Sequence, residues 1–254
     1  MFNFYSKPGK GVSENEPEKS LPALYFSVLW RKLRKFIGIN LLYLICTLPI
    51  VAISLYAISP ILMSFGMSWN NANIYLSAIM MYLVFIGIAP INIGVAAVFK
   101  QYSRQEHSWV VKDFLSTIKE NFGVCIKLLL IDLVFTIVLL ADFYLMPAFE
   151  GWMYVIVSIT TYFAALVYIS SHFFIYQIIL MFDVSAVSAL KNAVIIAIAK
   201  LPQCLLLFAV MLFVGVIINN PFTFLLLGFA PLSFASNLYA ERLLTKKYID
   251  NKSE

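Results

Sequence analysis

The stretch NLLYLICTLPIV, residues Asn40–Val51, decides the fold class. It opens with an amide, continues through apolar and small side chains, and carries a proline at position 49. Apolar residues extend on both sides of it, from Phe36 to Ile58. A run of about 20 apolar residues is what an α-helix needs to cross a hydrocarbon core roughly 30 Å thick. The stretch therefore predicts a membrane-spanning helix with a proline near its middle.

The whole chain has the composition of a membrane protein. Of its 254 residues, 62% are hydrophobic and 12% are charged, whereas a soluble domain is roughly half apolar and a quarter charged. The alternating pattern of barrel strands is absent, so the apolar runs predict helices. We predict an all-α polytopic protein with six transmembrane helices, at about 36–58, 74–99, 124–146, 152–182, 201–218 and 222–240. The short segment 219–221 would join the last two as a tight hairpin.

The basic residues predict the orientation. All 18 lysines and arginines lie before the first run, in or around the second connection, in the fourth connection, or in the tail, and the other three connections have none. The positive-inside rule then places both termini and both long loops in the cytoplasm of a multi-pass protein of the cell membrane. Because the excess positive charge is juxtamembrane and interrupted by acidic residues, we expect membrane lipid as the partner and no nucleic acid.

The chain divides into four parts by composition. Residues 1–19 form a polar cytoplasmic segment, 20–35 an interfacial basic amphipathic helix, 36–241 the six-helix membrane domain, and 242–254 a cytoplasmic tail. Ser20 is placed as an N-cap, and Leu21, Leu24, Val28 and Leu29 recur at helical spacing. The first apolar run starts too late for a cleavable signal peptide, so we expect the first span to remain as an anchor.

Several polar residues fall inside the predicted spans. Asp132 has no lysine or arginine three or four residues away, and a lone carboxylate in a bilayer is expensive. The topology places six polar side chains in the cytoplasmic half: Asn40, Asn92, Asp132, His172, Gln177 and Asn237. One hypothesis is that several of them meet in an inward-facing pocket or hydrogen-bonded cluster. The other is a purely structural Asp132, protonated or hydrated and bonded to Thr136 or a neighbouring asparagine.

Two further features are candidates for function. Pro49 frees the carbonyl of Ile45 and predicts either a static kink or a hinge. The fourth run is about 46 Å long as a helix, longer than the hydrocarbon core, so it must tilt strongly or project beyond the bilayer. If it projects inward, it would carry the second long loop below the membrane surface. The candidate cytoplasmic contacts are Asp183, Lys191 and Asn192 in that loop, and Lys119 and Asn121 in the first.

Catalytic and metal-binding patterns are missing from the sequence. The histidines are His107 and His172, and neither belongs to an HExxH or nucleophile motif. The cysteines Cys46, Cys125 and Cys204 have no metal-binding or CxxC spacing. We predict a non-enzymatic protein with no catalytic, cofactor-binding or metal residue.

The chain resembles the YesL family of Gram-positive bacterial membrane proteins over nearly its whole length. The resemblance is carried by KPGKGV, NLLYLICTLPIV, APINIGVAAVFKQYSRQEH, DFLSTIKENF and FDVSAVSALKNAVIIAIAKLPQCLLL, in that order. The first span departs from the family by continuing VAISLYAIS where the family tends to have a Thr-Ile-Gly step. The resemblance implies a companion of carbohydrate ABC importers and names no catalytic residue.

The expected function is an accessory or assembly subunit of an ABC-type carbohydrate importer, in contact with its permease or ATPase subunits. One alternative is a solute transporter or channel that uses the inner-half polar cluster as its site. Another is a membrane regulatory protein whose N-terminal segment is a contact arm.

Overall fold

The computed structural model describes residues 20–64, 88–217 and 228–250. The regular elements in these segments are helices, with no strand among them, which confirms the predicted all-α class. Three helical segments are long and apolar enough to cross a membrane, at Leu33–Ile50, Val110–Ala148 and Gly151–Phe182. A fourth is counted if Ala186–Ala199 and Leu201–Val210, which are bent by 87° at their junction, form one broken span. These are the helices of a membrane-embedded protein.

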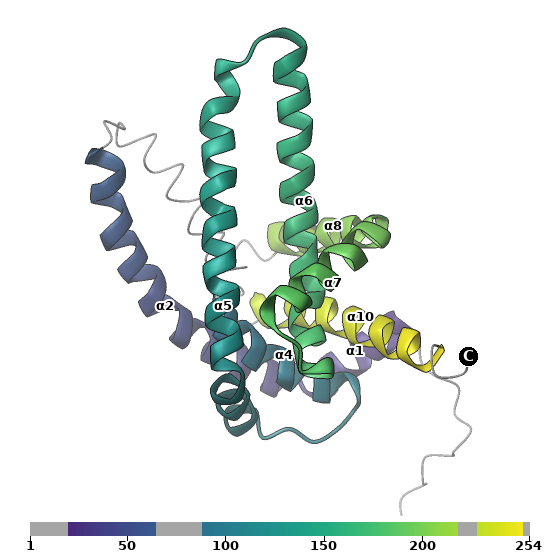
Figure 1. Cartoon of the computed structure of the whole chain (residues 1–254). Coiled ribbons are helices and arrows are strands. Elements are labelled where there is room, and N and C mark those ends of the chain that lie inside the picture. The colour runs from purple at the N-terminus through teal and green to yellow at the C-terminus, as the bar shows by residue number, and fades with distance from the viewer. Residues whose placement is uncertain (1–19, 65–87, 218–227, 251–254) are drawn as a thin grey trace, which may run out of the picture.

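Two of the three longest helices, α5 (Val110–Leu145) and α6 (Gly151–Phe182), form a helical hairpin that stands out in Figure 1. At 1.5 Å per residue they are about 54 and 48 Å long, so each exceeds the hydrocarbon core. The amphipathic start of α5 and the predicted third span are one continuous helix. The turn contains η1 (Met146–Ala148) and Gly151, whose φ of +58° is a conformation that glycine adopts without strain.

Helix α1 (Leu21–Arg31) and helix α2 (Leu33–Ser64) meet at Lys32. Leu24 and Val28 are buried, as their helical spacing predicts, and α1 packs on α10 (Phe229–Asp250) as well as on α2. The apolar face of α1 therefore covers protein. Helix α2 continues through Pro49 without ending, so the proline is accommodated inside a helix. Whether it acts as a hinge stays a prediction.

Aromatic rings from three helices form what we call the aromatic core. It contains Phe36 of α2, Phe99 and Tyr102 of α4 (Ala89–Ser103), and Phe234 of α10, with Phe36 lying 5.2–5.8 Å from the other three ring centroids. Offset and edge-to-face rings at this separation attract one another beyond their burial. The aromatic core thus joins the first and last described parts of the chain.

Helices α4 and α5 approach closely at Gly94. A β-carbon at this position would lie 2.6 Å from the buried Phe114 ring of α5, which is far inside van der Waals contact. At the end of α4, Lys100 Nζ donates to the carbonyl of Leu180 at 2.8 Å, so a cation satisfies the last turn of α6. Both contacts fix α4 against the hairpin.

Two predicted spans are described only in part. The run predicted at 74–99 is described from residue 88, where α4 begins, and the run predicted at 222–240 from residue 228. Helix α10 continues to Asp250, beyond the expected start of the tail. The predicted hairpin at 219–221 lies outside the described residues.

Helix α7 (Ala186–Ala199) folds back along the C-terminal half of α6, and α8 (Leu201–Ile217) leaves it at the 87° bend (Figure 1). The face of α7 toward α6 is a row of alanines, all buried: Ala186, Ala189, Ala193 and Ala197. Small side chains let two helix backbones approach closely. Asp183, at φ +47°, ends α6 and allows this reversal.

Candidate functional site

The carboxylate of Asp132 lies in the α5–α6 interface and is 1% exposed. The Tyr168 hydroxyl donates to its Oδ1 atom, and Nε2 of His172 lies 3.2 Å from the same oxygen. Thr136, which the sequence offered as a partner, donates instead to the backbone carbonyl of Asp132 at 2.6 Å. The buried acid is thus held by two side chains of α6, and neither is a lysine or arginine.

The hydrogen bonds of His172 determine how many protons the pair holds. Its Nδ1 atom lies 3.0 Å from the carbonyl oxygen of Tyr168, which can only accept, and its Nε2 atom faces the Asp132 carboxyl. Both contacts are hydrogen bonds when Nδ1 is protonated and one more proton lies between Nε2 and Oδ1, on either partner. The pair then has no net charge, which is the arrangement that costs least inside a bilayer.

The polar contacts continue along one face of α6. Tyr168, His172 and Tyr176 are four residues apart, so their side chains lie above one another. The imidazole is 6.4 Å from the Tyr176 ring, whose hydroxyl accepts from Asn92 Nδ2 of α4 at 3.2 Å. We call these five residues the α6 polar row: Asp132, Tyr168, His172, Tyr176 and Asn92. It links three helices through buried polar groups.

A second buried group lies beside the α6 polar row. Gln177 Nε2 donates to the carbonyl of Ala96 at 3.3 Å and to Asn237 Oδ1 at 2.7 Å, while Asn237 Nδ2 donates to the Ser233 carbonyl at 2.7 Å. Helices α4, α6 and α10 are joined through these amides. Within the described residues, Asn92 Oδ1 and Gln177 Oε1 are buried acceptors with no hydrogen-bond partner.

Asn40 binds the start of α10 instead of joining the other predicted polar residues. Its Oδ1 atom accepts from the backbone amides of Phe229 and Ala230, at 2.9 and 3.2 Å, and so satisfies the first N–H groups of α10. The six predicted polar residues are all buried, but they do not form a single group. Asp132 meets His172, Gln177 meets Asn237, Asn92 joins the row through Tyr176, and Asn40 caps a helix.

The candidate cytoplasmic contacts lie on the surface. Asp183, Lys191 and Asn192 are exposed at the end of α6 and on α7, and Lys119 is exposed on α5. Asn121 is half-buried and donates to the carbonyl of Thr117 at 3.0 Å, so its amide is partly used within α5.

Sequence reasoning missed three participants. Tyr168 and Tyr176 were hidden because tyrosine in an apolar run looks like packing, although their four-residue spacing around His172 is a usable signal. Glu241 falls one residue after the last predicted span, at the end of the predicted membrane domain, and was not singled out, whereas it is buried and binds Arg104 Nε at 2.9 Å. This ion pair fastens α10 to the end of α4.

Among the described residues, no three His, Cys, Asp or Glu side chains come together in a way that would hold a metal ion. Comparison with protein-family models, curated proteins and solved structures finds no match. The function proposed below is therefore inferred from the geometry of the described residues and from the resemblance to the YesL family.

Proposed function

We propose that the protein is a non-enzymatic accessory or assembly subunit of an ABC-type carbohydrate importer. In this proposal it crosses the cytoplasmic membrane six times, with both termini in the cytoplasm, and contacts the permease or ATPase subunits through its cytoplasmic surface. The resemblance to the YesL family supports a role in carbohydrate import. The observation that supports this contact is the exposed outward face of α7.

The outward face of α7 consists of Val187, Lys191, Ile195 and Ile198. All four are exposed, Val187 by 67% and Ile195 by 54%, and within the described residues no other helix covers them. An exposed cluster of apolar side chains beside a polar group is typical of a surface that contacts another protein or a membrane. The alanine face of the same helix is fixed on α6, so the outward face is presented on a rigid support.

The position of α7 fits such a contact. It follows the end of α6, a helix longer than the bilayer is thick, and precedes a bend into the next apolar helix. A short helix between two membrane segments is similar to the coupling loop through which ABC permeases engage their ATPases, a likeness we use as analogy only. The Ser185 hydroxyl caps α7 by accepting from the Ser188 amide at 3.3 Å.

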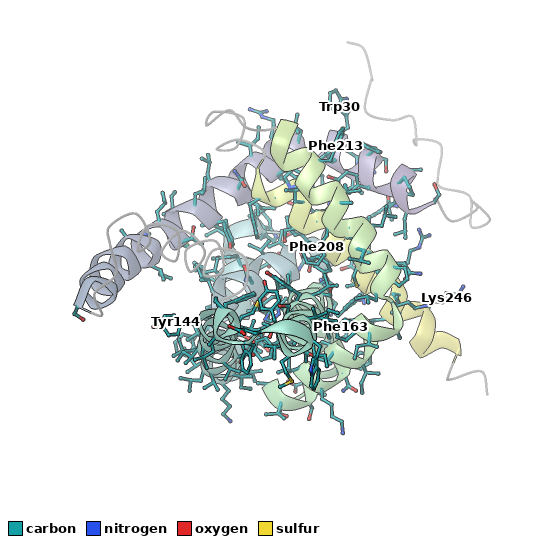
Figure 2. All side chains as sticks on the ribbon, turned by 90° about the horizontal axis from the view of Figure 1, so that it is seen from above. Trp30, Tyr144, Phe163, Phe208, Phe213 and Lys246 are labelled. Atoms are coloured by element: carbon teal, nitrogen blue, oxygen red, sulfur yellow. The ribbon has the colours of Figure 1, made fainter. Side chains whose placement is uncertain are left out.

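Copurification in a mild detergent tests this proposal. The tagged chain should recover permease or ATPase subunits, and the double variant Lys191→Glu, Ile195→Asp should lose them while keeping its helical content. Lys246→Glu, which reverses an exposed charge on α10, is the matched control and should behave like the unmodified chain (Figure 2). Recovery of the unmodified chain alone would contradict the proposal.

A second candidate, movement of a solute by this chain itself, is favoured by the two acceptors Asn92 Oδ1 and Gln177 Oε1. Buried acceptors beside the α6 polar row are where donor groups of a polar solute would bind. Proteoliposomes containing only this chain should then take up solute, and Asn92→Leu should abolish that uptake. Vesicles that contain the folded protein and take up no solute would exclude transport by this chain alone.

A further inference from the structure

An open groove of about 590 Å³ lies between the start of α2 and the start of α5. It is lined by Lys35 of α2, by residues 107–109 of the α4–α5 connection, and by Val110, Val111 and Lys112 of α5. The lining therefore combines cationic and apolar side chains. A ligand that fits such a lining has an anionic part and an apolar part.

The groove lies at the ends of two helical segments that could cross a membrane. One of these segments begins at Leu33 and the other at Val110. Lys35 and Lys112 are therefore within three residues of the point where each segment begins. Lys35 directly precedes the apolar part of its segment, which is the level at which lipid headgroups meet protein side chains. Lys112 is separated from the apolar part of α5 by Lys119, Glu120 and Lys127, and the contact of Lys35 with the Ser108 carbonyl holds the start of α5 beside Lys35.

Among the residues that the structure describes, no carboxylate pairs with the basic side chains around the groove. Arg31 Nη2 contacts the Gln105 amide oxygen at 3.4 Å, and Lys32 and Lys35 donate to the backbone carbonyls of Glu106 and Ser108, at 3.0 and 3.4 Å. These acceptors are neutral, so the contacts fasten the connection without cancelling charge. The five cations in this region are Arg31, Lys32, Arg34, Lys35 and Lys112.

The carboxylates of the same region are Glu106 and Asp113. Asp113 is already engaged, because its Oδ2 atom accepts from the Ser108 hydroxyl at 3.0 Å and from the Trp109 amide at 2.8 Å. Within the described residues, neither acid forms an ion pair with the five cations. The described residues consequently leave this positive charge without a carboxylate partner.

Large aromatic side chains surround the cations. Trp109 is 68% exposed, with the His107 ring edge-on at 5.1 Å, and Trp30 of α1 is 81% exposed. Figure 2 shows Trp30 pointing away from the helices. Exposed tryptophan at the end of a membrane segment is typical of side chains that lie among headgroups and the first acyl carbons.

We propose that this groove binds an anionic phospholipid of the adjacent leaflet, with its phosphodiester between Lys35 and Lys112 and its acyl region against Trp109 and Val111. A free phosphate would satisfy the lysines and leave the apolar wall exposed to water, so the lipid is the ligand that matches the whole groove. This site is independent of the importer contact on α7.

Native mass spectrometry of the full-length detergent-solubilised chain tests the site. Phosphatidylglycerol should bind more tightly than phosphatidylcholine of the same acyl chains. The variant Lys35→Gln, Lys112→Gln should lose about fivefold in phosphatidylglycerol affinity for each lysine removed. Inorganic phosphate should not compete, and raising the ionic strength should weaken the binding.

Two controls keep the result interpretable. Lys119→Gln, Lys246→Gln removes two exposed lysines outside the groove and should bind the lipid normally. Lys112→Gln alone leaves the Lys35 contact to Ser108 intact, so a fivefold loss there is not a folding defect. Equal affinity for the two lipids, equal affinity of the groove and control variants, or competition by phosphate would each overturn the proposal.

Discussion

Removing the His172 imidazole while leaving the Asp132 carboxylate should destabilise the α5–α6 hairpin by about 3 kcal/mol. Breaking a buried charged pair by removing one partner typically costs about 3–5 kcal/mol, because the remaining charge has lost its compensation. The lower end applies here, since the Tyr168 hydroxyl still donates to Oδ1 in His172→Leu. Asp132→Leu should cost less, about 1–2 kcal/mol, because a neutral imidazole can remain without a partner.

The double variant Asp132→Leu, His172→Leu separates a coupled pair from two independent residues. Replacing a buried pair by apolar side chains is often close to neutral, so the double variant should lie within about 1 kcal/mol of the unmodified chain. The free energies would come from reversible unfolding in mixed micelles, followed by helical circular dichroism. Thr160→Val, which removes an exposed hydroxyl from α6, should shift the free energy by less than about 0.5 kcal/mol.

Additive effects would refute this reasoning. If the double variant costs the sum of the two single variants within about 0.5 kcal/mol, Asp132 and His172 do not interact energetically despite their 3.2 Å contact. The shared proton inferred for the pair would then have no support.

Three other changes test the fold at separate places. Gly94→Ala should destabilise the chain by about 1–3 kcal/mol, because the new methyl group meets the buried Phe114 ring, whereas Gly38→Ala, with open space around it, should be neutral or slightly stabilising in the same unfolding assay. Burial, with two neighbouring cations adding to it, lowers the pKa of Lys32 from 10.5 to about 8, so its acylation, followed by peptide mass spectrometry, should reach half its maximal rate near pH 8. The folded state loses this proton at lower pH than the unfolded state, so the Lys32 contribution to stability should rise between about pH 8 and 10.5 and vanish in Lys32→Met. Asn40→Ala should remove about 1 kcal/mol of capping and speed amide hydrogen exchange at the start of α10, as measured by mass spectrometry of the corresponding peptide.

Helix type and approximate position were predictable because the apolar runs and helix signals are local. Helix α6 begins one residue before the predicted 152. Of the four residues that the spacing in α1 selects, Leu24 and Val28 are buried and Leu21 and Leu29 are half-buried. The continuity of α5 was harder to predict, because its start is amphipathic and its end is apolar. Only tertiary contacts, such as that of Phe114 with Gly94, require a single helix to run through both environments.

The partners of the polar residues were not predictable in the same way. The cost of a lone acid identified Asp132 as a residue that needs compensation, but the register between α5 and α6 determines which side chains reach it. That register depends on the turn at 146–150 and on packing along the whole hairpin. Asn40 is a further case, because it binds backbone amides 189 residues away, and no local pattern encodes such a distant acceptor.

The contact between Asn40 and α10 has a consequence for biogenesis. The asparagine and the aromatic side chains of α2 emerge from the ribosome first, whereas Phe234 and the backbone amides that donate to Asn40 are made almost 200 residues later. At about 5–20 residues per second, a gap of 189 residues corresponds to roughly 10–40 s. During that interval α10 is not yet available to bind Asn40. The insertion machinery must therefore accommodate this polar side chain of α2 until α10 is made.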